Sequence, residues 1–321
     1  MVCASEIGIT KLRVTGGEPL MRKGILPFIK RLSQIEGIKD ISITTNAVLL
    51  ESQIDEIVKS GVNRINISLD TLKPERFKFI SGRDHFETVW RGILAALDRG
   101  LSPIKLNAVI LRGVNDDEIE ALAGLSLKYP FHVRFIEYMP MGNSEVDISQ
   151  QVLVPEIKNI IERSMGTLEP VGQNVNNTNK QNDNMTDKSN HIDSGRFITN
   201  EAGPAKRYKI NGALGEIGFI SPVSSHFCHQ CNRLRLTSTG HLRPCLLNNS
   251  EIDLLTPLRE GASNNTIKHI FISAIKGKPA AHSLNSTNGV DNDNLNENNF
   301  TNGVEVGGDR HVDTQMSTIG G

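Results

Sequence analysis

Short runs of β-branched residues alternate with helical patterns over the first half of this chain. The runs predict strands at 11–17, 40–46, 64–70, 104–111 and 132–138. Between them, amphipathic segments predict helices at 24–37, 51–61, 86–100 and 116–129. This alternation indicates βα units on a parallel sheet, which either closes partly into a barrel or stays open and doubly wound. In both cases ligands bind at the carboxyl ends of the strands.

Composition excludes several classes of protein. The 321 residues are enough for one large domain or two ordinary ones. Lys and Arg number 35 against 36 Asp and Glu, so the surplus of positive charge needed to coat a nucleic acid is absent. No apolar run reaches the roughly 18 residues of a membrane-spanning helix. The chain has 4 cysteines, too few for a disulfide scaffold.

The start of the chain and two asparagine-rich stretches do not follow this pattern. Residues 1–10 resemble the end of a helix that leads directly into the first strand, so we expect at least one βα unit upstream of Met1. Residues 173–194 and 283–302 are rich in asparagine and poor in apolar side chains. We expect them to be disordered insertions, because they cannot bury enough apolar surface to offset the entropy of ordering.

Polar or flexible residues follow each predicted strand. The first strand ends in Gly16, Gly17 and Glu18, where two glycines let a backbone approach a ligand and the glutamate offers a carboxylate. A βα turn that merely requires glycine is an equally good explanation of this stretch. The second strand ends near Thr44 and the third at Ser68. Solvation explains any one of them, but it explains less well their presence at every strand end.

Cations recur on the predicted strands of this nearly neutral chain. They are Lys11, Arg13, Lys105 and Arg134. A period of two places Lys105 and Asn107 on one face of the fourth strand. A lysine inside a barrel is costly unless an anion meets it. The pattern predicts a small anionic ligand such as a nucleotide, with arginine suited to phosphate.

Three of the cysteines lie close together in sequence and predict a metal site. They are Cys228, Cys231 and Cys245, and the predicted hairpin 233–244 returns the third towards the first two. Zinc needs a fourth ligand, for which the nearby histidines are His226, His229 and His241. An iron–sulfur cluster needs only three thiolates if one iron remains open. The spacing alone slightly favours zinc.

Two arginines lie beside these cysteines in the sequence, and the fourth cysteine lies far from them. Arg233 and Arg235 project to the same side of an extended segment, as counter-charges for thiolates or as phosphate ligands. Two exposed arginines on a plain hairpin are the alternative. Cys3 is remote in sequence, and we expect it to be a small buried hydrophobe.

Seven motifs together resemble one family, the GTP 3′,8-cyclases, which are radical S-adenosylmethionine enzymes of molybdenum-cofactor biosynthesis. The motifs are RVTGGEP (13–19), ITTN (43–46), INISLD (65–70), GVNDDE (113–118), RFIEYMPMGN (134–143), FCHQCNRLRLTSTGHLRPCL (227–246) and the terminal STIGG. The C-x2-C-x13-C spacing with its adjacent N-R-x-R is the most specific of them. The resemblance covers nearly the whole chain outside the asparagine-rich stretches.

The resemblance implies an α/β fold. It is an incomplete (βα)6 TIM-type barrel whose first βα unit is missing from this sequence, followed by an α+β extension that carries an iron–sulfur cluster. The implied boundaries are residues 1–165 for the barrel and 166–282 for the extension. A tail at 303–321 ends in Gly-Gly.

The resemblance also implies site residues, although it assigns no catalytic side chain. S-adenosylmethionine would be bound by Gly16, Gly17, Glu18, Ser68 and Met139. GTP would be bound by Lys11, Arg13, Thr44, Lys105, Arg134, Arg233, Leu234 and Arg235. A [4Fe–4S] cluster would be held by Cys228, Cys231 and Cys245, which reverses the preference for zinc.

One departure from the family pattern is important. The family uses a C-x3-C-x2-C motif for a second cluster that cleaves S-adenosylmethionine, and this sequence contains none. We therefore expect one cluster and no radical generation in the chain as given. A catalytically inactive GTP- and S-adenosylmethionine-binding paralogue or isoform and a zinc-binding interaction module remain alternatives.

The resemblance also gives expectations about partners and compartment. It implies that cyclic pyranopterin monophosphate synthase acts on the product, and it allows a homodimer. We expect neither a nucleic-acid nor a membrane partner. The resemblance implies the mitochondrial matrix for a eukaryotic source and the cytoplasm for a bacterial one.

Overall fold

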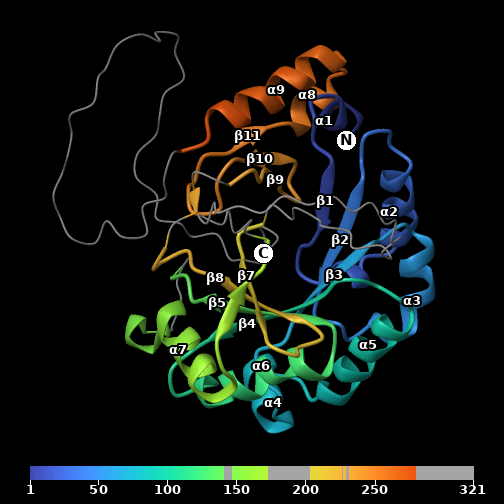
Figure 1. Ribbon diagram of the computed structural model, residues 1–321. Coiled ribbons are helices and arrows are strands. Elements are labelled where there is room, and N and C mark those ends of the chain that lie inside the picture. Colours follow the sequence, from blue (N-terminus) through green and yellow to red (C-terminus); the bar gives the residue numbers. More distant parts are fainter. Residues whose placement is uncertain (141–146, 173–202, 226, 229–230, 280–321) are drawn as a thin grey trace, which may run out of the picture.

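The computed structural model describes residues 1–140, 147–172, 203–225, 227–228 and 231–279 (Figure 1). An eight-stranded sheet has the order β1-β2-β3-β4-β5-β8-β7-β6. Its strands are β1 (Lys11–Val14), β2 (Asp40–Thr45), β3 (Arg64–Ser68), β4 (Ile104–Ile110), β5 (Phe131–Glu137), β6 (Leu168–Pro170), β7 (Lys206–Ile210) and β8 (Glu216–Ile220). Neighbouring pairs from β1 to β5, and the pair β5 and β8, are parallel. The edge formed by β8, β7 and β6 is antiparallel.

The helices lie around the outside of the curved sheet (Figure 1). They are α2 (Ile25–Ser33), α3 (Leu50–Lys59), α4 (Pro74–Ser81), α5 (Phe86–Asp98), α6 (Ile119–Lys128) and α7 (Val154–Met165), with short 3-10 turns η1 (Pro19–Met21), η2 (Asp116–Glu118) and η3 (Ile148–Gln150). The fold is the partial TIM-type barrel that was predicted. All five predicted strands and four predicted helices are present, whereas α4 and α7 were not predicted.

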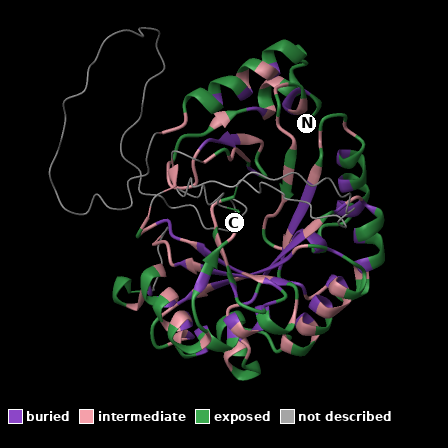
Figure 2. Cartoon of the chain, in the orientation of Figure 1, coloured by how far each residue is buried: buried purple, intermediate pink, exposed green. Residues whose placement is uncertain are grey.

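One face of the sheet packs against these helices through branched apolar residues. On β4, for example, Ile104, Leu106 and Ile110 are each at most 1% exposed and belong to the main hydrophobic core. Buried residues of the same core line the sheet-facing sides of the helices (Figure 2). The alternate residues of each strand must therefore point to the inner face of the sheet, since side chains alternate along a strand.

The C-terminal described residues form a second, smaller unit. It contains an antiparallel sheet of β9 (Arg235–Leu236), β10 (His241–Arg243) and β11 (Ile252–Asp253), followed by α8 (Leu255–Arg259) and α9 (Asn264–Lys276). The predicted hairpin is thus confirmed as the pair β9 and β10.

The N-terminal helix α1 (Val2–Glu6) packs against this unit rather than against the main core. Cys3, 9% exposed, lies in a small core with Leu242, Phe271 and other apolar side chains, so its prediction as a buried hydrophobe is confirmed. An ion pair between Glu6 and Lys268 joins α1 to α9. This contact and the pairing of β8 with β5 both cross the predicted boundary between residues 165 and 166.

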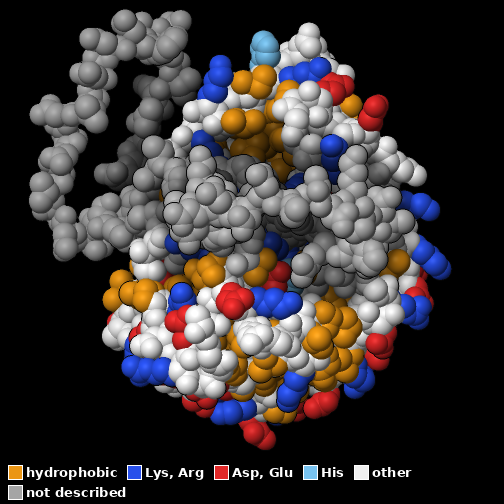
Figure 3. Space-filling view, viewed as in Figure 1, with side chains coloured by type: hydrophobic (Ala, Val, Ile, Leu, Met, Phe, Trp, Pro, Cys, Tyr) orange, Lys and Arg blue, Asp and Glu red, His pale blue; other side chains and the backbone are white. Residues whose placement is uncertain are grey.

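Some predictions concern parts of the chain outside the described residues. These are the insertions at 173–194 and 283–302, the tail at 303–321, and the candidate ligands His226 and His229. Among the helices that the structure does describe, none has the length and hydropathy needed to cross a membrane. On the face drawn in Figure 3, Lys and Arg are interspersed with Asp and Glu around the outer helices.

Candidate functional site

The inner face of the sheet is lined by polar side chains in rows that follow the strand register. Residues paired in register point to the same side of a sheet. One row runs Arg13, Ser42, Arg64 across β1 to β3. A second runs Thr44, Asn66, Lys105 across β2 to β4, and a third runs Ser68, Asn107, Arg134 across β3 to β5. Barrel interiors are usually filled by branched apolar residues, so this polar lining indicates a polar ligand.

Burial of this lining is substantial. Lys105 is 2% exposed and Arg134 is 6% exposed. Three neighbouring polar atoms on β2 to β4 have no hydrogen-bond partner among the residues that the structure describes: Thr44 Oγ1, Asn66 Oδ1 and Asn107 Oδ1. Buried polar groups are costly unless they are hydrogen-bonded, so a ligand with complementary donors would stabilise this arrangement.

A glycine makes room for one of the buried cations. Gly218 on β8 lies in register with Arg134 on β5. A Cβ atom at Gly218 would lie 3.0 Å from Arg134 Cγ, tighter than an ordinary contact. The absence of a side chain at 218 therefore lets Arg134 extend across the inner face.

Arginines from opposite ends of the described chain meet at this face. Burial, together with the guanidinium groups of Arg233, Arg64 and Arg235 and against the opposing charge of Asp40, lowers the pKa of Arg13 to about 10. Burial likewise lowers the pKa of Arg233 and that of Arg235. Arg64 is itself paired with Asp40, its Nε atom lying 2.9 Å from Oδ1. Taken as a whole residue, Arg13 is nevertheless exposed to solvent, as expected for a group that lines an accessible site.

The predicted metal ligands lie next to these arginines. Cys228, Cys231 and Cys245 are free and half-buried. The Cys231 N–H donates to the Cys228 carbonyl at 3.1 Å and closes the C-x2-C turn. The thiols of Cys231 and Cys245 both interact electrostatically with Arg235. Within the described ranges, however, no three His, Cys, Asp or Glu side chains form a group that could hold a metal ion.

A lysine from the end of α9 contacts the C-x2-C turn. Lys278 Nζ lies 3.3 Å from Cys231 Sγ and also donates to the carbonyls of Cys231 and, at 2.9 Å, Arg233. Burial acts to raise the pKa of Cys231, but the Arg233 amide and the Lys278 ammonium together hold it below its ordinary value. Thiolate is the form that binds metal, so the donor chemistry suits a thiolate-ligated cluster.

The loop after β1 offers an open backbone. Gly16 has φ +147°, a conformation that favours glycine, and a Cβ at Gly16 or Gly17 would meet no atom within 4 Å. Glu18 also fixes this loop, because its carboxylate accepts from Leu20 N at 3.0 Å, Thr45 Oγ1 at 2.7 Å and Asn46 N at 2.7 Å. An ionised carboxylate has roughly four acceptor positions, so most of Glu18 is engaged in fixing this loop to the end of β2.

The remaining predicted residues have different surroundings, and Leu234 packs against the small core beneath α1 and α9. Ser68 is exposed at the end of β3, and Met139 is half-buried just after β5. Lys11 is exposed at the first residue of β1, further from the strand carboxyl ends than Arg13. Leu234 is half-buried between the two arginines of the N-R-x-R motif.

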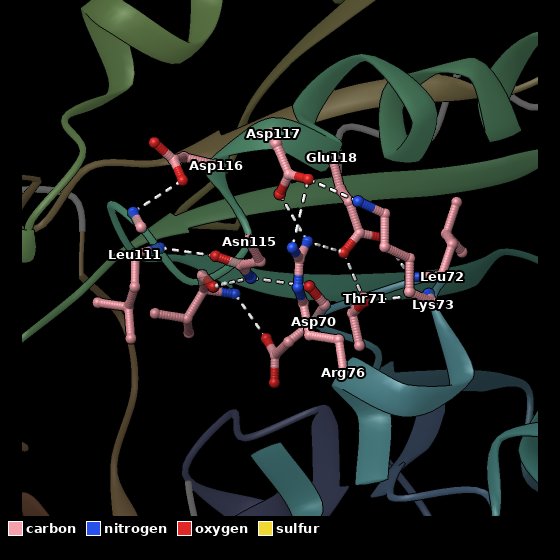
Figure 4. Close-up of polar contacts among 12 residues, drawn as sticks. Asp70, Thr71, Leu72, Lys73, Arg76, Leu111, Asn115, Asp116, Asp117 and Glu118 are labelled. Carbon is pink, nitrogen blue, oxygen red and sulfur yellow. Dashed lines mark hydrogen bonds and ion pairs between the residues drawn. The ribbon is translucent and has the colours of Figure 1, made fainter. Parts of the chain in front are cut away.

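Sequence reasoning missed a network that joins the loops after β3 and β4 (Figure 4). Glu118, 2% exposed, accepts from Thr71 Oγ1 at 2.6 Å and Leu72 N at 2.7 Å and pairs with Arg76. Asn115 Nδ2 donates to the carbonyl of Asp70 at 2.7 Å. The GVNDDE motif could have signalled this network, because its Asn and Glu supply the buried contacts.

Asp70 lies beside this network and faces the ends of the strands. Its Oδ1 accepts from Val109 N at 2.8 Å, and burial raises its pKa in spite of that hydrogen bond. Backbone contacts thus hold Asp70 in place at the end of β3, next to Ser68.

Comparison with known proteins identifies two matching family models. The model described as "Radical SAM superfamily" matches residues 3–125, and that described as "Molybdenum Cofactor Synthesis C" matches residues 168–284. The chain is 44% identical over 282 residues to the "GTP 3′,8-cyclase" of Heliobacterium modesticaldum, covering 88% of this chain and 79% of that protein. It is 43% identical, with the same coverage, to the protein of that name from Pelotomaculum thermopropionicum. It is 42% identical to that from Moorella thermoacetica, over 88% of this chain and 79% of the relative.

Proposed function

Because this chain belongs to the GTP 3′,8-cyclase family of radical S-adenosylmethionine enzymes, we propose that its substrate site is the cationic inner face of the sheet. The reaction is the cyclisation of GTP to (8S)-3′,8-cyclo-7,8-dihydroguanosine 5′-triphosphate, the first step of molybdenum-cofactor biosynthesis. The observation that carries the assignment of the site is that Arg13 is close enough to Arg233 and Arg235 for their charges to add to the effect of burial, and together these lower the pKa of Arg13 to about 10.

These arginines bind the triphosphate in this proposal. Guanidinium groups present paired N–H donors that match phosphate oxygens, and phosphate would relieve the mutual repulsion of the three cations. Lys105 and Arg134 extend the positive charge across the buried part of the inner face. Lys11, Thr44 and Leu234 complete the proposed GTP contacts.

Cys228, Cys231 and Cys245 would hold a [4Fe–4S] cluster. The proposal is supported by three free, half-buried thiols, two of them on one hydrogen-bonded turn, and by Lys278 and Arg235 as neighbouring cations. The three thiols do not form a metal-binding group as the described residues stand, so they would have to move together around the cluster. When bound, the cluster supplies an iron with an open coordination position for the guanine. The protein's part is to favour the thiolate of Cys231 through the Arg233 amide and the Lys278 ammonium, which hold its pKa below the ordinary value against the effect of burial.

S-adenosylmethionine would be bound by Gly16, Gly17, Glu18, Ser68 and Met139, and it supplies the carbon radical that this family uses. The fit rests on the open backbone at the two glycines. Glu18 acts mainly by holding that backbone against the end of β2. Since the three clustered cysteines are the only grouped thiols of the sequence, we propose one cluster per chain.

Equilibrium binding of GTP to anaerobically reconstituted protein tests the proposal. We expect saturable binding of GTP, with a higher affinity than that of GMP, because the arginines contact the triphosphate in this proposal. Iron and sulfide analysis should give one [4Fe–4S] cluster per chain, lost in the variant Cys228→Ser/Cys231→Ser/Cys245→Ser. Failure to bind GTP, or stoichiometric zinc without labile sulfide, would contradict the proposal.

The cysteine content predicts a limit on turnover by these 321 residues. Without a C-x3-C-x2-C motif, we expect GTP binding but no release of 5′-deoxyadenosine when S-adenosylmethionine and dithionite are added. Release of 5′-deoxyadenosine by this chain would overturn the assignment of a single cluster. We further propose that cyclic pyranopterin monophosphate synthase acts on the product. We also propose that the protein is a homodimer, which a measurement of its mass in solution tests.

A further inference from the structure

Glu137 at the end of β5 is a buried carboxylate that no part of the proposed site uses. Its side chain is 0% exposed. Oε2 accepts from the backbone N–H groups of Val223 at 3.0 Å and Ser224 at 2.9 Å. Oε1 accepts from Val154 N at 2.9 Å and from the hydroxyl of Ser224. The four donors account for the roughly four acceptor positions of an ionised carboxylate, and none of them is a cation.

These donors come from two other segments of the chain. Val154 is the first residue of α7, whose N-cap residue, Leu153, has no side-chain acceptor. An anion at this place satisfies an otherwise unpaired N–H and is favoured by the helix dipole. Val223 and Ser224 follow β8 and lead to Cys228. Glu137 therefore ties the end of β5 to both segments at once.

The Val223–Ser224 peptide is part of a compact turn before the cysteines. Ser225 N donates to the Ser221 carbonyl at 3.2 Å, and Lys206 Nζ contacts Ser225 Oγ at 3.2 Å. On the far side of the cysteines, Lys278 holds Cys231 and the carbonyl of Arg233. Among the described residues, Glu137 thus fixes the chain at Val223 and Ser224, ahead of Cys228, and Lys278 fixes it at Cys231 and Arg233.

We propose that Glu137 is a positioning residue that fixes Cys228, Cys231 and the following arginines against the inner face of the sheet. The inference deepens the proposed function, on which it rests. All four contacts require an acceptor, so a glutamine at 137 would turn an N–H2 group towards N–H donors and lose part of the set. The charge of the carboxylate strengthens each of the remaining contacts.

The test compares Glu137→Gln with the matched control Glu118→Gln. Glu118 is equally buried, at 2% exposed, and accepts from a hydroxyl and a backbone N–H, but it joins the loops after β3 and β4. In folded, cluster-free protein, an alkylating reagent followed by peptide mass analysis measures the modification rates of Cys228 and Cys231. We expect Glu137→Gln to raise both rates about tenfold, which corresponds to losing one hydrogen bond to a charged group, and Glu118→Gln to leave them unchanged.

Two further readouts follow reconstitution. Glu137→Gln should retain several-fold less iron per chain than Glu118→Gln and bind GTP about tenfold more weakly, in proportion to the lost hydrogen bond. Equal cysteine rates, iron content and GTP affinity in the two variants would overturn the proposal. If wild-type protein binds neither GTP nor iron, the proposed function fails, while the cysteine rates still decide the role of Glu137.

A second pair keeps the test decisive if Glu137→Gln does not fold. Ser224→Ala removes only the hydroxyl donor to Glu137, and Thr71→Ala removes the corresponding donor to Glu118. Faster modification of Cys228 in Ser224→Ala, but not in Thr71→Ala, supports the positioning role. Equal rates in these two variants contradict it.

Discussion

Arginine has opposite surroundings at two places in this molecule. On the inner face, burial and the neighbouring guanidinium groups of Arg233 and Arg235 lower the pKa of Arg13. In the loop network of Figure 4, the hydrogen bonds that Arg76 donates to the carboxylate of Asp117, and also to that of Glu118, raise the pKa of Arg76. The loop network is neutralised within the protein and holds the fold together. The inner face is a set of cations that crowd one another, which is what a site for an anionic ligand requires.

The largest expected effect is on the affinity for GTP, when one of the crowded arginines of the inner face is removed. Arg235→Ala should weaken GTP binding about ten- to a hundredfold, as expected from the loss of about 1.5–3 kcal/mol for a charge-assisted contact. Without GTP the variant should be at least as stable as wild type, because one mutually repelling charge is gone. Isothermal titration with GTP and thermal unfolding measure the two quantities.

Arg76→Ala is the control for that result, since it removes an arginine that the protein itself neutralises. It should bind GTP with wild-type affinity. If Arg235→Ala and Arg76→Ala changed the affinity equally, the difference between the two arginine environments would have no functional meaning.

The second effect is on stability and is expected in the loop network. Arg76→Ala leaves Glu118, 2% exposed, without its cation, although Thr71 and Leu72 still donate to it. We expect the free energy of unfolding to fall by about 1–3 kcal/mol, the range for a buried polar group that loses a partner. Urea unfolding measures it, and the variant Arg76→Ala/Glu118→Gln should recover part of the loss because the buried charge is removed.

The smallest effect is a dependence of stability on pH. Hydrogen bonds from Arg76 and Lys73 lower the pKa of Asp117 to about 2 from 3.8. A carboxylate with a lowered pKa in the folded state stabilises it above the unfolded pKa, and that contribution disappears as the pH falls through about 2. Because half of the Asp117 side chain is exposed, we expect about 0.5 kcal/mol at neutral pH.

Comparing wild type with Asp117→Asn over the acid range isolates this contribution. The two proteins should differ above pH 4 and converge towards pH 2. A difference that stays constant across that range would show that Asp117 does not act through its charge.

Much of the fold could be predicted from local pattern. Apolar and polar side chains alternate along strands such as β4. This alternation places Ile104, Leu106 and Ile110 towards the helices and Lys105 towards the inner face. Helix α4 was missed because it buries no residue completely and has no clear apolar stripe. The edge of the sheet formed by β6 to β8 was missed because its strands are short and the asparagine-rich stretch separates β6 from β7 and β8 in the sequence.

The candidate site, like the fold, could be predicted from the sequence only in part. The chemical types of its members, cations at strand ends and cysteines at C-x2-C spacing, could be found in the sequence together with the family they indicate. The engagement of Glu18 with Thr45 and Asn46 could not, because it depends on where β2 ends relative to the loop after β1. The role of Glu137 was hidden for the same reason, since its donors lie 17, 86 and 87 residues further along the chain.

By itself, the sequence determined the βα alternation, the polar inner face and the types of group available for phosphate and metal. These follow from short-range periodicity, which depends only on neighbouring residues. Tertiary structure alone decided which charges neutralise each other and which are left crowded, because electrostatic interaction depends on distance and burial rather than on order along the chain. Arg76 pairs with the carboxylates of Asp117 and Glu118, whereas Arg13 lies near the guanidinium groups of Arg233 and Arg235. The charge of the neighbouring side chains therefore distinguishes an arginine that stabilises the fold from one that is available to a ligand.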